Sequence, residues 1–410
     1  MKKQPLIAGI ELGPRRFIAA AGRISDPSHF CVQAIESVPA QGFEREGLGD
    51  ALECADGITR LVRQLERAVG GRVTTALAAF PAHHVKSFNA SSSIPIPEPG
   101  AGISRQDVER AIGTCRTLSL DYDRQILHAF ERSFTIDGQT GVKNPIGLSG
   151  RKLGVEIHLV TALNLSVQNL TRVLNRGGLE VEQFVLPGLA CAEGVLSDLD
   201  RDLGVTLVRI GDFQTEVILF DDGQVKETIL ISGGWDDLVE NVSRAFRLPR
   251  APAEHLLEQV RTLEENPAGA AAVPLRAGLG ASVRTFPAQE VIQRVRGRVR
   301  DLLHKVQRRV TSNPVFLDCA SGVVVVGHLA RLEGFLEIAE EMLNVPVRLG
   351  TVKEMEVAPG MTLRSQDTVA IGLLRHGLRR RFASVHPANA ALPVWLRPFD
   401  RFRRVLQEYF

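Results

Sequence analysis

The loop "GVKNPIGLSG" at Gly141–Gly150 and the strand-like run "LGVEIHLVTA" at Leu153–Ala162 are informative about the fold when they are taken with two segments before them. "ISRQDVERAI" at Ile103–Ile112 has the Ser-x-x-Asp spacing of a helix N-terminus, and "QILHAF" at Gln125–Phe130 is strand-like. A long loop rich in Ser, Pro and Gly precedes these segments. Together they predict a separate small α+β unit at about residues 82–161.

The remainder of the chain falls into two halves that begin in the same way. "LIAGIELGPRRFIAAAGRI" at Leu6–Ile24 and "LVRIGDFQTEVILFDDGQVKETILIS" at Leu207–Ser232 are apolar runs joined by tight turns, which predicts strands joined as hairpins. An amphipathic helix is expected at Asp50–Val69, and mostly helices at Trp235–Val310. The repeated opening suggests an internal duplication at the level of structure.

Composition excludes several classes of protein. The 410 residues are 44% apolar and 23% charged, which is ordinary for a soluble globular protein with two or more domains. The five cysteines are scattered, which argues against a disulfide framework or a zinc site and fits a reducing cytosol. The net charge of +2 gives no global field for nucleic acid. Since no segment has the ~20 apolar residues of a spanning helix, a membrane link would be peripheral.

The four segments quoted first, in this order and spacing, resemble the inserted subdomain 1C of FtsA, a bacterial cell-division family within the actin-like ATPase superfamily. "LPGLACAEGVL" at Leu186–Leu196 and "RLEGF" at Arg331–Phe335 also resemble that family. The resemblance runs over nearly the whole chain. It implies an α/β fold class, an actin-like two-lobed fold around a cleft, with an inserted FtsA-type 1C subdomain and a C-terminal amphipathic helix.

The resemblance also implies the subdomain boundaries. Subdomains 1A and 2A would each carry one phosphate hairpin facing the cleft. Subdomain 1A is expected at 1–81 and 163–190 with a closing helix at 366–382, 1C at 82–162, 2A at 191–232 and 319–365, 2B at 233–318, a linker at 383–394, and a membrane-targeting amphipathic helix at 395–410.

The nucleotide site that the resemblance implies is degenerate here. Its candidate residues are Glu11, Gly13, Gly211, Thr215, Glu254 and Gly327. The first hairpin has Glu11-Leu12-Gly13-Pro14 where the family has Asp-x-Gly-Thr. The second has Arg209-Ile210-Gly211-Asp212-Phe213-Gln214 where the family has Asp-Ile-Gly-Gly-Gly-Thr. The acid that would face Mg²⁺ is thus a cation, and two glycines that would let the backbone approach phosphate are lost.

The loops around adenosine depart as well, because Leu257 replaces the lysine of a Glu-x-x-Lys pair and His328 replaces a glycine. The carboxylate of Asp212, if it lay about 4 Å from one phosphate charge, would cost roughly 4 kcal/mol of binding free energy at an effective dielectric of about 20. Pairing of Arg209 with Asp212 or with phosphate would offset part of this cost. ATP binding is therefore expected to be weak or lost. ATP and Mg²⁺ are the candidate cofactors. The residues include no recognisable catalytic set and no metal-ligand set, so efficient ATP hydrolysis is not expected.

A basic amphipathic helix is predicted at Gln289–Val310, "QEVIQRVRGRVRDLLHKVQRRV". The resemblance places it in subdomain 2B, where FtsA receives the acidic tail of the tubulin-like protein FtsZ. Electrostatic steering of an acidic peptide would give Arg294, Arg296 and Arg300 a use as tail-binding residues. The alternatives are a solvated helix face and a nucleic-acid surface, although the aromatic residues that accompany the latter are missing.

The C-terminal segment at Trp395–Phe410, "WLRPFDRFRRVLQEYF", predicts an amphipathic helix too short to span a membrane but suited to lie in its interface. The residues expected to bind lipid are Trp395, Phe399, Phe402, Arg403, Arg404, Leu406, Tyr409 and Phe410. The alternative is a terminal helix docked on the protein's own core. The Pro/Ala linker before it and the upstream cluster Arg375, Arg379, Arg380 and Arg381 favour the membrane.

Taken with these features, the resemblance implies an adaptor that tethers FtsZ filaments to the cytoplasmic face of the bacterial inner membrane at the division site and supports assembly of the Z ring and divisome. Its expected partners are the FtsZ C-terminal tail, further copies of itself in a head-to-tail filament, anionic lipid, and other divisome proteins through subdomain 1C, with no nucleic acid. Two alternatives stay open: an active actin-like ATPase with nucleotide-driven polymerisation, and an actin-like adaptor of type IV pilus assembly.

Overall fold

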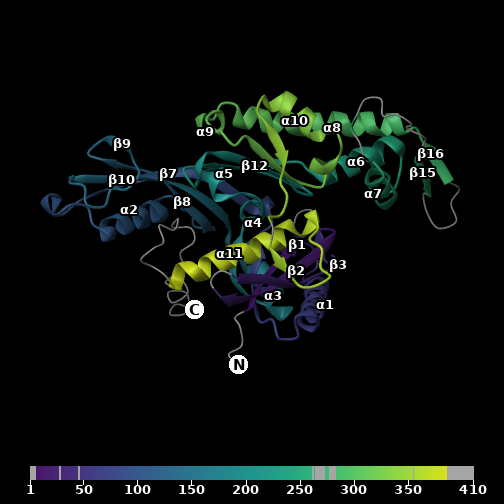
Figure 1. Ribbon diagram of the computed structural model, residues 1–410, viewed down its shortest axis with the longest axis horizontal. Helices are drawn as coiled ribbons and strands as arrows, with labels where there is room; N and C mark the ends of the chain where they lie inside the picture. Colours follow the sequence, from purple (N-terminus) through teal and green to yellow (C-terminus); the bar gives the residue numbers. More distant parts are fainter. Residues whose placement is uncertain are drawn as a thin grey trace.

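The computed structural model describes residues 6–26, 29–44, 47–260, 263, 273–276, 283–353 and 355–385. Its elements form two lobes, one above the other in Figure 1, and a smaller unit projects from one end. The predicted α/β class is confirmed, whereas the predicted C-terminal helix at 395–410 lies outside the described residues. Among the helices described, none combines the length and the apolar character needed to cross a membrane.

Lobe 1 is built on a six-stranded sheet with the strand order β11-β6-β1-β2-β3-β19. Helix α1 (Ala51–Val69) begins at Asp50, whose carboxylate accepts hydrogen bonds from the N–H groups of Leu52 and Glu53. The other elements of this lobe are β1 (Leu6–Leu12), β2 (Arg16–Asp26), β3 (His29–Pro39), β4 (Phe43–Glu44), β5 (Gly47–Leu48), β6 (Thr75–Ala79), α3 (Asn164–Arg176), β11 (Glu180–Val185) and β19 (Glu356–Val357).

The inserted unit has its own four-stranded sheet, ordered β7-β10-β8-β9, and its own hydrophobic core. Helix α2 (Arg105–Leu118) packs against this sheet and begins with a capping box, in which Ser104 and Asp107 each bond the other's backbone N–H. The strands are β7 (Val85–Pro95), β8 (Arg124–Ile136), β9 (Gln139–Val142) and β10 (Lys152–Leu163). The separate α+β unit predicted from the sequence is therefore present as a distinct sheet and helix.

Lobe 2 is built on a five-stranded sheet with the strand order β14-β13-β12-β17-β18. The predicted meander is formed by β12 (Val205–Ile210), β13 (Gln214–Asp221) and β14 (Gln224–Ser232). The remaining elements are α6 (Trp235–Phe246), α7 (Arg250–Glu258), β15 (Val273–Arg276), β16 (Val283–Phe286), α8 (Ala288–Val310), α9 (Pro314–Leu317), β17 (Val323–Gly327), α10 (Phe335–Leu343) and β18 (Val347–Leu349).

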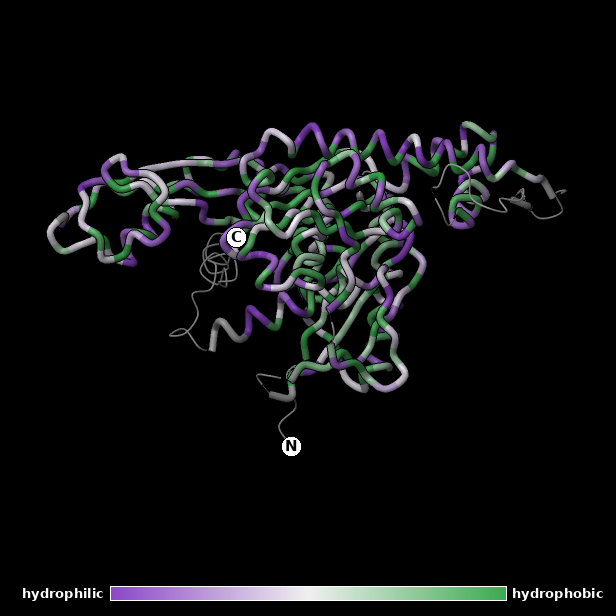
Figure 2. The backbone as a smooth tube through the Cα atoms, turned by 45° about the horizontal axis from the view of Figure 1, so that its top comes forward, coloured by the Kyte–Doolittle hydropathy of each residue, from purple (hydrophilic) through white to green (hydrophobic). Residues whose placement is uncertain are grey.

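Both faces of the lobe 2 sheet are buried, which explains its continuous apolar strands. Leu207 packs into the hydrophobic cluster that continues from lobe 1, while its neighbour Val208 packs into the cluster formed with the helices of lobe 2. Hydrophobic residues accordingly gather in the central body of the molecule in Figure 2. The two lobes thus share a continuous core on one side of this sheet.

The chain crosses between the lobes at two helices that pack on each other. It enters lobe 2 through α4 (Pro187–Val195) and α5 (Asp198–Asp202), and it ends in lobe 1 with α11 (Thr368–Val385). At the crossing of α4 and α11, a Cβ on Gly372 would lie 1.8 Å from the carbonyl oxygen of Ala190. Only glycine permits this approach, so the crossing is tightly packed.

Candidate functional site

A cleft of about 640 Å³ lies between the two lobes, at the place predicted for the nucleotide. Its walls include the β1–β2 turn of lobe 1 and the β12–β13 turn of lobe 2. All the predicted nucleotide residues except Thr215 line it, namely Glu11, Gly13, Gly211, Glu254 and Gly327. Thr215 is fully buried instead, and its hydroxyl donates to the carbonyl oxygen of Gly233 at 2.9 Å.

Other cleft residues were not found by sequence reasoning. Arg15, Arg16, Trp235 and Arg250 also line the cleft. Arg15 and Arg16 directly follow the Gly13-Pro14 turn, so the predicted hairpin could have placed them at this wall. Trp235 and Arg250 belong to helices of lobe 2 that approach the cleft only through tertiary packing, and no sequence pattern marks them.

The guanidinium of Arg209 joins carboxylates of both lobes. Its Nη1 donates to Glu216 Oε1 at 2.8 Å, and its Nη2 donates to Glu11 Oε1 at 3.2 Å. Glu216 Oε2 also accepts a hydrogen bond from the N–H of Gly188 at 2.6 Å. Of the two possible partners considered for Arg209, Asp212 is not the one that it bonds, because the antiparallel register of β12 and β13 places Arg209 directly opposite Glu216.

Asp212 instead pairs with an arginine of the opposite lobe. Arg15 Nη2 lies 2.8 Å from Asp212 Oδ1, and Arg15 Nη1 lies 3.4 Å from Glu254 Oε1 on α7. The Arg15 guanidinium also lies 5.6 Å from the centroid of the Trp235 ring, which packs edge-on against His328. Arg15 of lobe 1 therefore contacts three parts of lobe 2, namely the β12–β13 turn, α7 and α6.

Burial dominates the electrostatics at the centre of the cleft. It raises the pKa of the Glu11 carboxyl to about 7, because the nearby cation Arg209 only partly offsets the desolvation while Asp212 and Glu216 add repulsion. Burial likewise raises the pKa of Glu216 and brings that of the Cys191 thiol to about 12. Burial lowers the pKa of Arg209, but Glu216, Cys191 and Glu11 outweigh it and leave the net pKa above its usual value. Arg209 is thus permanently charged.

Several features of these residues disfavour Mg²⁺ and a nucleotide triphosphate. Arg209 places a positive charge among the carboxylates that would face the metal, and Pro14 has no N–H to offer phosphate. The N–H of Gly13 donates to Arg16 O and that of Gly211 to Gln214 O, so both are used inside their own hairpins. In the described part of the chain, no group of three or more His, Cys, Asp or Glu side chains could hold a metal ion.

A second hollow of about 480 Å³ lies between α6 and α8 in lobe 2, and we call it the α6–α8 groove. Its basic residues are Arg244 on α6 and Arg298 and Lys305 on α8. The remaining residues that line it are Gly234, Asp237, Leu238, Glu240, Asn241, Asp301, Leu302 and His304. The spacing of Arg298, Asp301 and Lys305 places them on one face of the helix, and that face borders the groove.

The three arginines predicted to bind the FtsZ tail lie outside this groove. Arg294 pairs with Glu290 at 3.4 Å and Arg300 pairs with Glu341 at 2.9 Å. Arg296 donates to the carbonyl oxygen of Leu263 at 2.7 Å. The predicted helix is present as α8, but the sequence alone could not show which of its polar faces borders a hollow.

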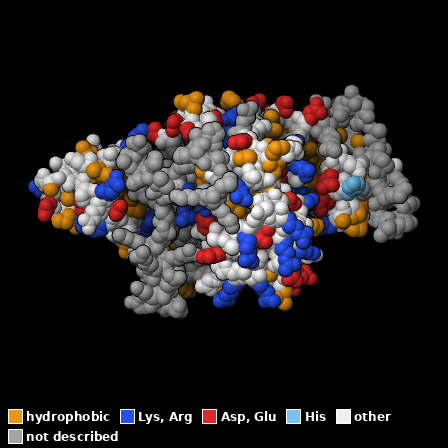
Figure 3. All heavy atoms as spheres, turned by 60° about the horizontal axis from the view of Figure 1, so that its bottom comes forward, with side chains coloured by type: hydrophobic (Ala, Val, Ile, Leu, Met, Phe, Trp, Pro, Cys, Tyr) orange, Lys and Arg blue, Asp and Glu red, His pale blue; other side chains and the backbone are white. Residues whose placement is uncertain are grey.

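The predicted lipid-binding residues, Trp395, Phe399, Phe402, Arg403, Arg404, Leu406, Tyr409 and Phe410, lie outside the described residues. The upstream arginine cluster is only partly available to lipid. Arg379 pairs with Glu193 and Asp198, and Arg381 lies 3.7 Å from Glu182. Burial lowers the pKa of Arg375. These pairings make the cluster a weaker argument for the membrane than its charge suggested. On the face of the molecule shown in Figure 3, Lys and Arg side chains lie beside Asp and Glu side chains.

Comparisons with known proteins identify the relatives of this chain. The family model described as the SHS2 domain inserted in FtsA matches residues 82–161, which hold the four-stranded unit. The cell-division protein FtsA of Pseudomonas aeruginosa is 26% identical over 377 residues, covering 92% of this chain and 90% of the relative. Both the inserted unit and the whole length therefore match the same family.

The chain is an FtsA-like protein.

Further FtsA proteins also match the chain, and solved structures share its fold. The FtsA proteins of Neisseria meningitidis and Escherichia coli K12 are 24% and 25% identical, and the matches cover 95% and 91% of this chain and 94% and 90% of those relatives. The PilM–PilN type IV pilus biogenesis complex matches with a TM-score of 0.63 at 14% identity, over 91% of this chain and 98% of that one. MreB5 of Spiroplasma citri bound to ADP matches with a TM-score of 0.54 at 10% identity, over 94% and 99%. The FtsA-like chain thus has the actin-like fold and an actin-like role in cell division.

Proposed function

We propose that this FtsA-like chain is a cell-division adaptor that tethers FtsZ filaments to the cytoplasmic face of the inner membrane and supports divisome assembly. The observation that carries the proposal is the FtsA-type unit at residues 82–161, inserted in an actin-like fold. The match to FtsA relatives along nearly the whole chain supports it. The likeness to the PilM–PilN complex concerns the fold alone, and the FtsA-type inserted unit favours division over pilus assembly.

The α6–α8 groove is the best site for the acidic FtsZ tail. Arg244, Arg298 and Lys305 supply positive charge, and Leu238 and Leu302 supply apolar surface. The carboxylates of Asp237, Glu240 and Asp301 also line the groove. Arg244 pairs with Glu240, and Arg298 pairs with Asp301 at 3.0 Å, between side chains that are largely exposed. Since exposed ion pairs are worth only about 0–1 kcal/mol, an acidic peptide could replace these partners at little cost. The predicted Arg296 and Arg300 contact Leu263 and Glu341 instead and lie outside the groove.

ATP binding in the cleft is proposed to be weak or lost, with Glu11, Gly13, Gly211, Thr215, Glu254 and Gly327 kept mainly for shape. The pairing of Arg209 with Glu11 and Glu216 supports this, because it uses the cation that could have met phosphate. Calorimetry with ATP and Mg²⁺ tests this point. Micromolar affinity that Gly211→Asp abolishes would show a working nucleotide site and favour the active ATPase.

Membrane attachment is proposed to reside in the segment 395–410, with self-assembly into filaments and contacts of the inserted unit to other divisome proteins as further parts of the same role. A chain that ends at Val394 should lose flotation with anionic vesicles while the full chain floats. If the truncated chain still floats, the anchor lies elsewhere.

Localisation in cells tests the proposal as a whole. A fluorescent fusion of the full chain should colocalise with FtsZ at mid-cell. A fusion that colocalises with pilus machinery would support the pilus adaptor instead.

A further inference from the structure

Ion pairs span the cleft and join the lobes directly, two of them between the facing hairpins. Glu11 in lobe 1 meets Arg209 in lobe 2 at 3.2 Å, and Arg15 in lobe 1 meets Asp212 in lobe 2 at 2.8 Å. The first contact is well shielded, since the Glu11 and Arg209 side chains are only 15% and 16% exposed. Both contacts lie where the two hairpins face each other, so they oppose separation of the lobes.

The inserted unit forms a second connection to lobe 2, away from the cleft. His158 on β10 has 1% exposure, and its Nε2 accepts a hydrogen bond from the N–H of Thr228 on β14 at 3.0 Å. Ser87 on β7 donates to the carbonyl oxygen of Thr228 at 2.6 Å. At the end of the unit, Lys143 pairs with Asp222 at 2.8 Å. The unit is covalently part of lobe 1, so these bonds also tie lobe 1 to lobe 2.

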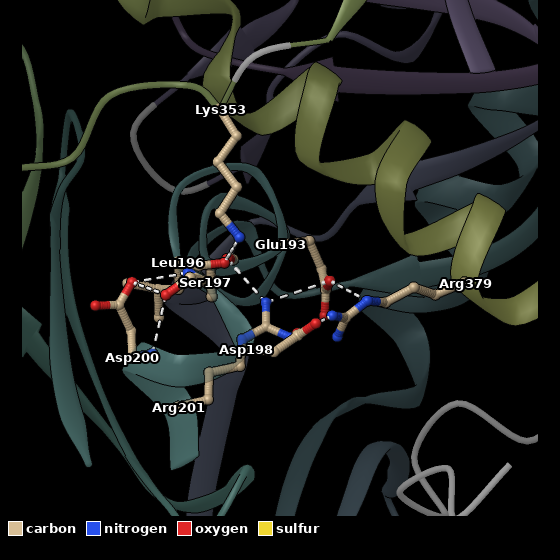
Figure 4. A network of polar contacts seen from close by, with 9 residues as sticks. Glu193, Leu196, Ser197, Asp198, Asp200, Arg201, Lys353 and Arg379 are labelled. Atoms are coloured by element: carbon tan, nitrogen blue, oxygen red, sulfur yellow. Dashed lines mark hydrogen bonds and ion pairs between the residues drawn. The ribbon is translucent and has the colours of Figure 1, made fainter. Parts of the chain in front are cut away.

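A third connection lies where α4 and α11 cross. Glu193 on α4 is buried between Arg201 at 3.3 Å and Arg379 of α11 at 3.4 Å, and Arg379 also pairs with Asp198 on α5. Figure 4 shows these side chains turned toward one another, with Lys353 reaching the carbonyl oxygen of Leu196 beside them. Charged groups thus connect the lobes at the crossing helices as well as across the cleft.

We propose that these three sets of contacts form an internal clamp that holds the lobes in one arrangement without a nucleotide. The cleft cations Arg15 and Arg209 occupy the space between the hairpins and supply the attraction that a bound ligand would otherwise provide. The clamp goes beyond the proposed adaptor function. It does not depend on that function, because it concerns only contacts inside this chain. It implies that the exposed surfaces of the two lobes keep a constant relative position whether or not ATP is present.

Pulsed electron spin resonance on the full chain measures this arrangement. Spin labels replace Leu52 on α1 of lobe 1 and Leu317 on α9 of lobe 2, both of which are exposed, in a background where the partly exposed Cys31 and Cys319 are changed to Ser. The clamp predicts one narrow distance distribution that ATP and Mg²⁺ do not change. A broad distribution that narrows when ATP and Mg²⁺ are added would overturn the proposal.

Charge reversal then tests the cleft contacts. Arg15→Glu should broaden the distribution, because the new carboxylate faces Asp212 and Glu254, and the double variant Arg15→Glu/Asp212→Arg should narrow it again. Arg16→Glu is the matched control, since Arg16 lines the same cleft but bonds Ser37 within lobe 1. Equal broadening by both single variants, or no broadening by either, would contradict the clamp.

Thr228→Val gives an independent test at the second connection, should the cleft variants fail to fold. It removes the hydroxyl that lies 2.8 Å from His158 Nε2 without changing the size of the side chain. It should broaden the distribution while the cleft remains intact. Because the N–H of Thr228 still donates to His158 Nε2, an unchanged distribution would exclude the Thr228 hydroxyl contact from the clamp. Binding to FtsZ and vesicles is measured separately, so failure of the clamp and failure of the adaptor role are distinguishable.

Discussion

Arg209 lies directly opposite Glu216 in the β12–β13 ladder and also reaches Glu11 of the other lobe at 3.2 Å. One guanidinium therefore contacts two largely buried carboxylates at the centre of the cleft. Where the phosphate-site pattern is lost, the charged groups Arg209, Glu11 and Glu216 thus pair with one another.

Arg209→Met should destabilise the protein strongly. It would leave Glu11 and Glu216 buried without a cation, and removal of one partner of a buried ion pair costs about 3–5 kcal/mol. Urea unfolding followed by circular dichroism measures the change in the free energy of unfolding. As a control, adding Glu11→Gln and Glu216→Gln to Arg209→Met should recover most of the loss, and failure to recover it would show that the guanidinium acts through packing.

The stability of the wild type should fall relative to Glu11→Gln as the pH rises from about 4.5 to about 7. The pKa of Glu11 is raised from 4.5 to about 7 in the folded chain, so the folded state binds more protons than the unfolded state in this window. The contribution of the raised Glu11 pKa to the free energy of unfolding is complete below pH 4.5 and is lost as the pH rises through 7. The groups that face it are Arg209, Asp212, Glu216 and Cys191.

Thermal unfolding of both proteins across this range checks the sign. A difference in stability that stays constant from pH 5 to pH 8 would mean that Glu11 titrates normally.

Gly372→Ala should destabilise the crossing of the two interlobe helices by about 1–3 kcal/mol, the usual cost of overpacking. The added methyl would meet Ala190 O at 1.8 Å, so α4 and α11 must move apart. Gly113→Ala is a matched control in helix α2, where no atom lies within 4 Å of the added Cβ. Because alanine favours a helix interior by roughly 0.5–1 kcal/mol, the control should be neutral or stabilising. Thermal denaturation measures both, and equal effects would contradict the tight crossing.

Charge reversal in the α6–α8 groove should weaken binding of an FtsZ C-terminal tail peptide by about tenfold or more, because it replaces steering attraction by repulsion. The test variant is Arg298→Glu/Lys305→Glu, and fluorescence anisotropy of the labelled peptide gives the affinity. Arg294→Glu/Arg300→Glu carries the same charge change on the same helix but outside the groove. A larger loss in this second variant would place the peptide on the face predicted from the sequence.

The parts of the fold that local patterns determine could be predicted from the sequence, and the contacts between distant segments could not. The meander at β12–β14 and the capped helix at Arg105 follow from apolar runs, turns and caps. The pairing of Arg209 with Glu216 was also within reach, because the two residues flank the β12–β13 turn symmetrically. Arg15 and Asp212, by contrast, meet only because two hairpins from different lobes face each other.

The helix α8 shows the same limit at the candidate peptide site. Its apolar face was predicted correctly, since periodicity determines which side is buried. The position of α6 determines which polar face of α8 borders a groove. The sequence of α8 alone does not indicate that position. The predicted Arg294, Arg296 and Arg300 were therefore chosen by charge, while the hollow lies beside Arg298 and Lys305.

Co-sedimentation of the full chain with FtsZ filaments and anionic vesicles, with and without ATP and Mg²⁺, tests whether the chain links FtsZ to the membrane without a nucleotide. The adaptor account predicts that FtsZ is recovered with the vesicles only when the chain is present, and to the same extent without ATP. Vesicles that recover no FtsZ, or recover it only when ATP and Mg²⁺ are added, would contradict the account.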